Sequence, residues 1–187
     1  MDKNIKTILS DSYNANAKLR DKPNISEWKQ AELDFFLSRL EQRKDLKIVD
    51  VGAGTGQQGQ YLKEHGHEVT CIDLSSEMVQ RCKARGLDAY EMDFYAIDFP
   101  PASFDAAWSM NTLLHVPKSS FRKVFLNIKN VLKQDGLFYF GMYGGKDFEG
   151  IWEEDIYEPN RFFSFYEHEA IKEKAGDLFE IVDLTAH

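Results

Sequence analysis

A carboxylate and a set of glycines follow a short apolar run in the first third of the chain. Asp50 stands near the end of this run, and Gly52, Gly54, Gly56 and Gly59 come directly after it. Glycine lets a backbone approach a ligand closely, and a helix that begins there points free N–H groups at the ligand. The fixed charge of Asp50 would repel a pyrophosphate, whereas it suits a ligand that carries an ammonium group. The turn is therefore predicted to hold a ligand that carries an ammonium group and no phosphate.

Two more carboxylates follow later apolar runs. Asp73 ends the second run, and Asp93 follows the third. Singly, each of these acids has a plain alternative as a solvated loop residue. Because the carboxyl ends of parallel strands meet at one edge of a sheet, the three acids together favour a cofactor site there.

The glycine spacing leaves one alternative open. Gly54, Gly56 and Gly59 satisfy the GxGxxG pattern, and Asp73 lies about 20 residues further on, as in dinucleotide sites. An NAD-dependent oxidoreductase is thus the rival enzyme, and the position of Asp50 argues against it.

Apolar, β-branched runs alternate with amphipathic runs along the chain. We expect strands at 47–51, 68–72, 87–91, 104–110 and 137–143, with helices at 56–65, 75–85 and 118–133. This alternation predicts an α/β fold with a mostly parallel sheet covered on both faces. A further amphipathic helix is expected at 26–43, residues 1–25 are too polar to assign, and the long connection at 144–161 is typical of a functional loop.

Cap residues mark several helix ends. Thr55 with Gln58, and Ser164 with Glu167, have the spacing of a capping box, and Ser75 is expected to cap the second helix of the alternating series. Glycines of the left-handed kind are expected after helices at positions 66, 86, 136 and 176.

The motifs resemble those of the class I S-adenosylmethionine-dependent methyltransferases. The first motif of that family, an acidic residue followed by GxGxG, appears as DVGAGTG at 50–56. CIDLSSEM at 71–78 and EMDF at 91–94 match the ends of its second and third strands, and the stretch from Phe104 to Phe140 follows its fourth strand, helix and fifth strand. The resemblance spans residues 47–143 in the expected order.

The resemblance implies a three-layer Rossmann-like methyltransferase fold that binds S-adenosylmethionine and releases S-adenosylhomocysteine. In it, Asp73 would accept the ribose hydroxyls, Asp93 the adenine amino group, and Phe94 would offer its backbone N–H to the ring. Met78 would pack near the adenine. The cofactor contacts that it implies come from Asp50, Gly52, Ala53, Gly54, Gly56, Asp73, Leu74, Met78, Asp93, Phe94 and Met110.

The implied chemistry is in-line transfer of the sulfonium methyl group, for which the protein has to hold the acceptor and exclude water. His115 is the candidate catalytic base because its pKa suits proton removal near neutrality, and a structural role is its alternative. Acceptor contacts are expected from Tyr13, Met110, Asn111, and Tyr143 with the 144–161 loop. A catalytically silent domain that retains the cofactor is the rival outside the enzymes.

Composition sets the remaining expectations. The 187 residues suit one domain, divided into an N-terminal helical cap (1–45), a cofactor-binding core (46–143) and an acceptor-side segment (144–187) with a last helix and strand. A net charge of -8 argues against nucleic acid as the main partner. No segment has the length of a membrane span or the form of a signal peptide, so a cytoplasmic enzyme with a small-molecule acceptor is expected. Cys71 and Cys82 stand apart without a cluster of histidines, so no metal is expected.

The C-terminus departs from the family pattern. The chain ends at LFEIVDLTAH, which leaves room for a sixth strand and none for a seventh. Either the sequence is shortened, or a partner such as a second copy covers an unpaired edge, or activity is impaired.

Overall fold

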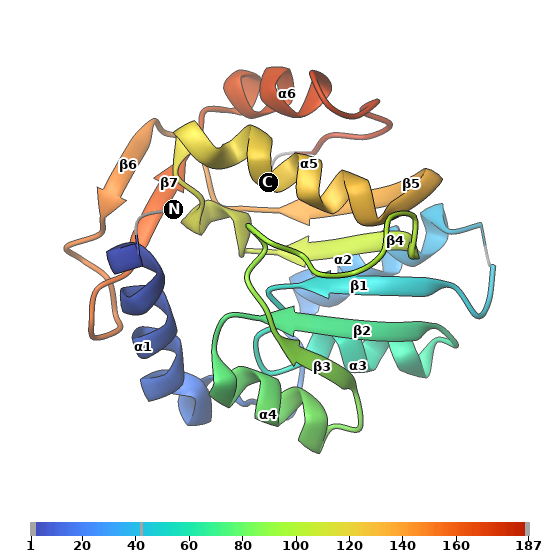
Figure 1. Ribbon diagram of the computed structural model, residues 1–187, viewed down its shortest axis with the longest axis horizontal. Helices are drawn as coiled ribbons and strands as arrows, with labels where there is room; N and C mark the ends of the chain where they lie inside the picture. The colour runs from blue at the N-terminus through green and yellow to red at the C-terminus, as the bar shows by residue number, and fades with distance from the viewer. Residues whose placement is uncertain (1–2, 42, 186–187) are drawn as a thin grey trace.

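A parallel sheet forms the centre of the protein. The computed structural model describes residues 3–41 and 43–185, and its main sheet has five strands in the order β3-β2-β1-β4-β5 (Figure 1). All neighbours in this sheet pair in parallel. The strands are β1 (Lys47–Val51), β2 (Glu68–Asp73), β3 (Asp88–Glu91), β4 (Phe104–Met110) and β5 (Leu132–Gly141). The chain reverses its direction of winding between β1 and β4, which is where α/β sheets bind ligands.

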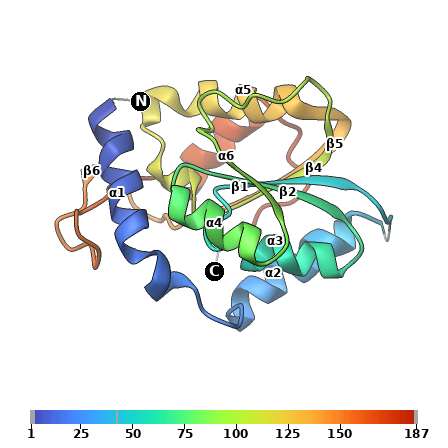
Figure 2. The same cartoon turned by 60° about the horizontal axis from the view of Figure 1, so that its bottom comes forward.

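Helices cover both faces of this sheet, as Figure 2 shows. One face carries α2 (Glu27–Arg39), α3 (Gln57–Glu64) and α4 (Ser76–Ala84), and the other carries α5 (Phe121–Val131) and α6 (His168–Gly176). The two apolar layers are separate clusters, with Phe36, Leu62 and Trp108 in the first and Phe125 and Ile128 in the second. The predicted three-layer α/β fold is confirmed.

The remaining helix, α1 (Lys3–Arg20), lies across the carboxyl edge of the sheet (Figure 1). It contacts α4 and β7 (Phe162–Phe165) and buries Leu9, Ser12 and Ala17. The sequence did not predict this helix because the segment is mostly polar, and only a narrow stripe of its side chains is buried against the protein.

A small antiparallel hairpin interrupts the predicted loop at 144–161. It pairs β6 (Phe148–Ile151) with β7 (Phe162–Phe165). Two short 3₁₀ turns, η1 (Leu113–His115) and η2 (Lys118–Ser120), connect β4 to α5. The capping box expected at Ser164 and Glu167 is wrong, because Ser164 lies in β7 and α6 begins at His168.

Other predicted helix ends had mixed outcomes. Ser75 caps α4, accepting a hydrogen bond from the backbone N–H of Met78 over 3.2 Å. The Thr55–Gln58 box is wrong, since left-handed Gly56 occupies the cap position of α3. Gly66 and Gly86 have the expected positive φ, whereas the glycines at 136 and 176 lie within β5 and at the end of α6.

The predicted sixth strand is also wrong for the described residues. Residues 177–185 form no strand, because Leu178 is buried and Phe179 packs its ring against Phe125 and Phe138. β5 therefore remains an edge strand among the described residues, and the main sheet has no sixth or seventh strand there. Five positions lie outside the described residues. Residues 1–2 belong to the predicted cap, residue 42 to the helix predicted within that cap, and residues 186–187 to the predicted last strand. Within the described residues, no helix has the length and apolar character to cross a membrane.

Candidate active site

The glycine turn connects β1 to α3 at the carboxyl edge of the sheet. Gly52 and Gly54 have φ values of +74° and +56°, in the left-handed region that favours glycine. The backbone N–H of Gly52 donates to the carbonyl of Ile72 over 2.8 Å, which ties the turn to β2. A Cβ on Gly52 would lie 2.1 Å from the Thr112 side chain, whereas a Cβ on Gly54 would meet nothing within 4 Å. The turn is thus packed on one side and open at Gly54.

Asp73, at the end of β2, is fixed by this turn. Its Oδ2 accepts from the backbone N–H of Gly54 over 2.9 Å, and its Oδ1 accepts from that of Ser75 over 2.9 Å. Burial raises the pKa of Asp73 to about 6, against the opposing effect of those two N–H groups. Each carboxylate oxygen retains a further acceptor position for a ligand hydroxyl.

A narrow cavity lies between α1 and the strand ends. Its walls come from α1, from the glycine turn, from the ends of β2 and β4, and from the segments after β3 and β4. The lining residues are Leu9, Tyr13, Arg20, Gly52, Gly54, Ile72, Asp73, Leu74, Met92, Phe94, Met110, Asn111, Thr112 and His115. The cavity holds about 60 Å³ with α1 in this position. Ligand sites typically span about 300–1,000 Å³, so we expect α1, which forms one wall of the cavity, to move outwards when a nucleoside binds.

The predicted cofactor residues divide into two groups. Gly52, Gly54, Asp73, Leu74, Phe94 and Met110 line the cavity, and the base candidate His115 does so as well. Asp50, Ala53, Gly56, Met78 and Asp93 are not among its lining residues. Their assigned contacts with the cofactor stay predictions.

Asp93 is bound by other residues of the protein, whereas Asp50 is buried and its Oδ2 has no hydrogen-bond partner among the described residues. Asp50 is 2% exposed, and burial, followed by the nearby charge of Asp73, raises its pKa to about 7. Asp93 accepts from the backbone N–H of Tyr95 over 2.9 Å and forms an ion pair with Lys6 of α1. The ammonium group of Lys6 therefore competes with any amino group of a ligand for the Asp93 carboxylate.

Sequence reasoning missed several lining residues, above all Leu9 and Arg20 of α1. Leu9, Tyr13, Ala17 and Arg20 follow one another at the three- and four-residue spacing of one helix face. This spacing could have predicted α1 and the side chains that it turns towards the cavity.

A buried hydrogen-bond network surrounds His115. Its Nδ1 lies 2.6 Å from the carbonyl oxygen of Phe162, which only accepts, so Nδ1 carries the proton. Nε2 therefore accepts from the hydroxyl of Tyr13 over 2.6 Å. Burial lowers the pKa of His115 to about 3. A base role for His115 stays a prediction, and these bonds supply the competing role of positioning Tyr13.

Arg161 extends this network towards the 144–161 loop. Its Nη1 donates to the hydroxyl of Tyr13 over 3.0 Å, and its Nε and Nη2 donate to the two oxygens of Asp155 over 2.7 and 2.6 Å. The predicted acceptor residue Tyr143 and part of the 144–161 loop line a second cavity of about 410 Å³, which Arg161 also lines. Across the described residues, no group of three or more His, Cys, Asp or Glu side chains is placed to hold a metal ion.

The sequence matches a known domain family over its central part. Residues 49–140 match the family described as a methyltransferase domain. Together with the sheet order and the glycine turn, this match confirms the predicted resemblance of this segment to the class I S-adenosylmethionine-dependent methyltransferases.

Individual relatives support the same class. A putative methyltransferase from Geobacillus sp. (strain WCH70) is 30% identical over 152 residues, which are 76% of this chain and 60% of that protein. A malonyl-[acyl-carrier protein] O-methyltransferase from Pseudescherichia vulneris is 28% identical over 102 residues, 54% of this chain and 37% of the relative. The chain thus spans less than two thirds of either relative.

A solved structure matches more of the fold. The 1,6-didemethyltoxoflavin-N1-methyltransferase of Burkholderia thailandensis, with bound 1,6-didemethyltoxoflavin and S-adenosylhomocysteine, has a TM-score of 0.73 at 20% identity. The match covers 92% of this chain and 76% of that one. The shared fold therefore extends beyond residues 49–140.

Proposed function

We propose that the chain transfers the methyl group of S-adenosylmethionine to a small-molecule acceptor. The observation that carries this proposal is the fixed carboxylate of Asp73 beside the open face of Gly54, 2.9 Å from its N–H. Two free acceptor positions on one carboxylate suit the two hydroxyls of a ribose. The family match and the class of the relatives support the same activity.

The residues of the cavity fit the proposed cofactor. Ile72, Leu74, Met92 and Phe94 offer an apolar wall for the adenine, and Gly54 leaves room for a close approach of the backbone. When bound, S-adenosylmethionine supplies an electrophilic methyl group on a good leaving group. The protein's part is to orient the two reactants, and α1 excludes water from the site.

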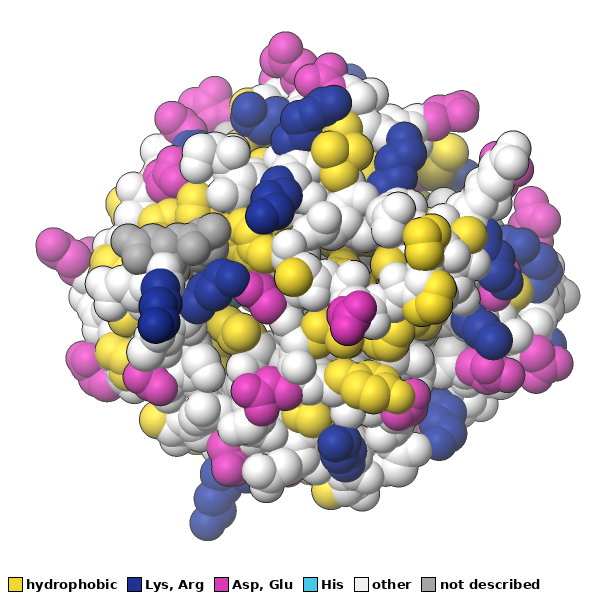
Figure 3. Space-filling view, viewed as in Figure 1, with side chains coloured by type: hydrophobic (Ala, Val, Ile, Leu, Met, Phe, Trp, Pro, Cys, Tyr) yellow, Lys and Arg dark blue, Asp and Glu magenta, His cyan; other side chains and the backbone are white. Residues whose placement is uncertain are grey.

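The acceptor is proposed to be small. In Figure 3, acidic and basic side chains are interspersed over the visible face, and no continuous basic surface appears among its coloured residues. Nucleic acids are recognised chiefly through clustered Lys and Arg, so this distribution favours another class of acceptor. A cytoplasmic location belongs to the same proposal.

We also propose that a second copy covers the β5 edge. Edge strands leave N–H and C=O groups unpaired, and β5 has no neighbour on its outer side among the described residues. Light scattering of the purified protein is expected to give the mass of a dimer, and the mass of one chain would refute this part.

Methyl transfer is tested by incubating the protein with S-adenosylmethionine and panels of small amines, phenols and carboxylic acids. Formation of S-adenosylhomocysteine together with a methylated panel member is the expected result. Asp73→Ala is the negative control. Tight cofactor binding without any product would favour the silent cofactor-binding domain, and tight NADH binding would favour the oxidoreductase.

A further inference from the structure

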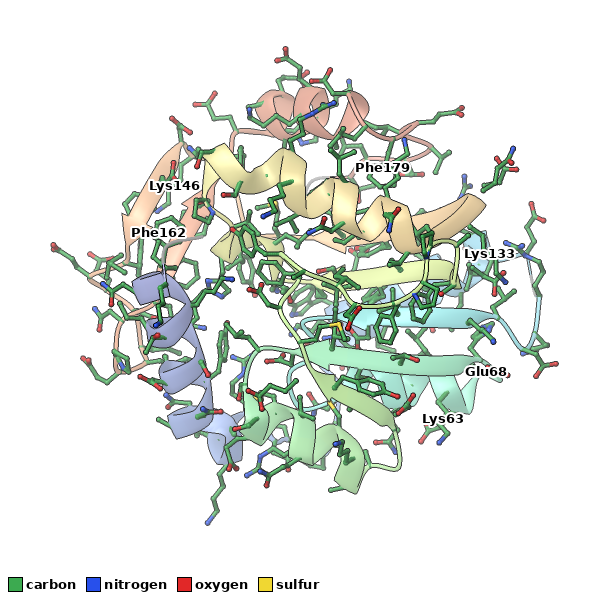
Figure 4. The ribbon with its side chains drawn as sticks, in the orientation of Figure 1. Lys63, Glu68, Lys133, Lys146, Phe162 and Phe179 are labelled. Carbon is green, nitrogen blue, oxygen red and sulfur yellow. The ribbon has the colours of Figure 1, made fainter. Side chains whose placement is uncertain are left out.

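An ammonium group of the chain itself sits on aromatic rings beside the active site. Lys146 Nζ lies 4.1 Å from the centroid of the Trp152 ring and 5.4 Å from that of Phe165. Contacts of this kind are attractive because the face of an aromatic ring is electronegative. Figure 4 labels Lys146 at the β6–β7 hairpin. Among the described residues, no carboxylate forms an ion pair with Lys146.

The hairpin holds these rings in place. Phe165 is buried in β7 and pairs in register with Phe148 of β6. Trp152 follows β6 and contacts both rings edge-on, with centroids 5.0 Å from Phe148 and 5.5 Å from Phe165. The aromatic surface is therefore built by secondary structure, and Lys146 lies on it from outside.

This surface belongs to the cavity of about 410 Å³ described above, which has room for a small molecule. Its other walls include Tyr143 and Phe163, so four of its ten lining residues are aromatic. The cavity also borders the cofactor site, since Phe163 contacts the ring of His115 at 4.7 Å and Arg161 binds Tyr13.

Charge favours a cationic ligand over an anionic one. Arg161 is the other cation of the lining, and its donors already bind Asp155 and Tyr13. Glu154 also lines the cavity. Asp155 is paired with Arg161, so a ligand that displaces Lys146 Nζ meets Glu154 as the remaining charge of the lining, and this charge attracts a cation.

We propose that this cavity binds the organic ammonium group of a small molecule against Trp152 and Phe165, in the place that Lys146 Nζ takes in the free protein. The identification of that molecule as the acceptor, or its methylated product, rests on the proposed function. Binding of the ammonium group itself needs no methyl donor.

The test is a binding titration with choline and with its neutral isostere 3,3-dimethyl-1-butanol, without methyl donor. The two probes share a shape and differ in charge. We expect choline to bind at least tenfold more tightly than the isostere. Lys146→Met is expected to strengthen choline binding several-fold, because the competing ammonium is gone, whereas Lys172→Met on α6 leaves it unchanged.

A second pair of variants tests the ring itself. Trp152→Leu is expected to weaken choline binding at least tenfold, and Phe35→Leu, on α2, serves as its matched control. Circular dichroism verifies that both variants fold. Should Trp152→Leu fail to fold, the Lys146→Met result decides, since that side chain is exposed.

Three results would overturn the proposal: equal binding of the isostere, weaker choline binding by Lys146→Met, or preferential binding of benzoate. A titration of the same sample with S-adenosylhomocysteine separates the two proposals. Binding of S-adenosylhomocysteine without choline refutes the ammonium site alone. Binding of choline without S-adenosylhomocysteine supports the ammonium site and refutes the proposed function.

Discussion

The hydroxyl of Tyr13 lies 2.6 Å from Nε2 of His115, and this bond joins α1 to the turn that follows β4. Arg161 donates to the same hydroxyl over 3.0 Å. α1 is thereby connected to the residues on both sides of the active site. The helix that closes the cofactor cavity is thus held by polar contacts at its inner face.

Removal of this hydroxyl is expected to destabilise the protein. Tyr13→Phe leaves Nε2 of His115 without its donor and one N–H group of Arg161 without its acceptor, and both residues are buried. Such unsatisfied groups cost about 1–3 kcal/mol, so the free energy of unfolding in urea should fall by that amount. Tyr90→Phe removes an exposed hydroxyl and is the control. Equal stability of the two variants would show that the network contributes nothing.

His115 is expected to stay neutral over the physiological range of pH. Burial lowers its pKa to about 3 from the ordinary value of 6.5. As the pH falls below 6.5, the unfolded chain binds a proton here and the folded protein does not, so this residue reduces the stability between about pH 6.5 and 3. NMR of the imidazole signals between pH 8 and 4, assigned by comparison with His115→Gln, should show no titration of His115. A midpoint near pH 6 would contradict the burial argument and revive the base role.

Gly52 is expected to tolerate no side chain. Its Cβ would lie 2.1 Å from Thr112, in addition to the strain of a positive φ. Gly86 has a φ of +75° with nothing within 4 Å of an added Cβ, so Gly86→Ala measures the strain alone. The strain of a left-handed backbone typically costs about 1–2 kcal/mol, which is the loss expected for Gly86→Ala. Denaturant unfolding should show a larger loss of stability for Gly52→Ala. Equal losses would mean that Thr112 moves aside freely.

The ion pair between Lys6 and Asp93 is expected to oppose ligand entry. We expect α1 to move outwards when a nucleoside binds, so loss of this contact should favour the open protein. The two side chains are 32% and 19% exposed, and such pairs contribute about 0–1 kcal/mol. Calorimetry should therefore show up to about fivefold tighter binding of S-adenosylhomocysteine to Lys6→Gln, and no change for Lys3→Gln. Weaker binding to Lys6→Gln would indicate that Lys6 contacts the ligand.

The sequence was sufficient to predict the main sheet and the helices that cover it. The alternation of strands and helices is a local pattern that the sequence carries directly. In a parallel sheet, the carboxyl ends of the strands lie at the same edge regardless of how the side chains pack. Asp73 and the glycine turn were predictable for this reason. The fold class followed from the same pattern together with the family resemblance.

Long-range contacts explain the errors. The apolar residues near the C-terminus resemble a strand locally, yet Phe179 packs on α5 and β5 instead of pairing. The capping box at Ser164 was overridden by the pairing of β7 with β6. The ion pair of Asp93 with Lys6 joins residues 87 positions apart, and no periodicity in the chain indicates it.

The affinity of Asp73→Ala for S-adenosylhomocysteine, measured by calorimetry beside the unmodified protein and Asp88→Ala, tests the central claim most directly. Asp88 begins β3, at the end of the sheet opposite the cavity. If the Asp73 carboxylate holds the ribose, its removal should weaken binding by about 1–3 kcal/mol, or roughly five- to 150-fold, while Asp88→Ala binds normally. Equal affinity of all three proteins, or no binding by the unmodified one, would contradict the account.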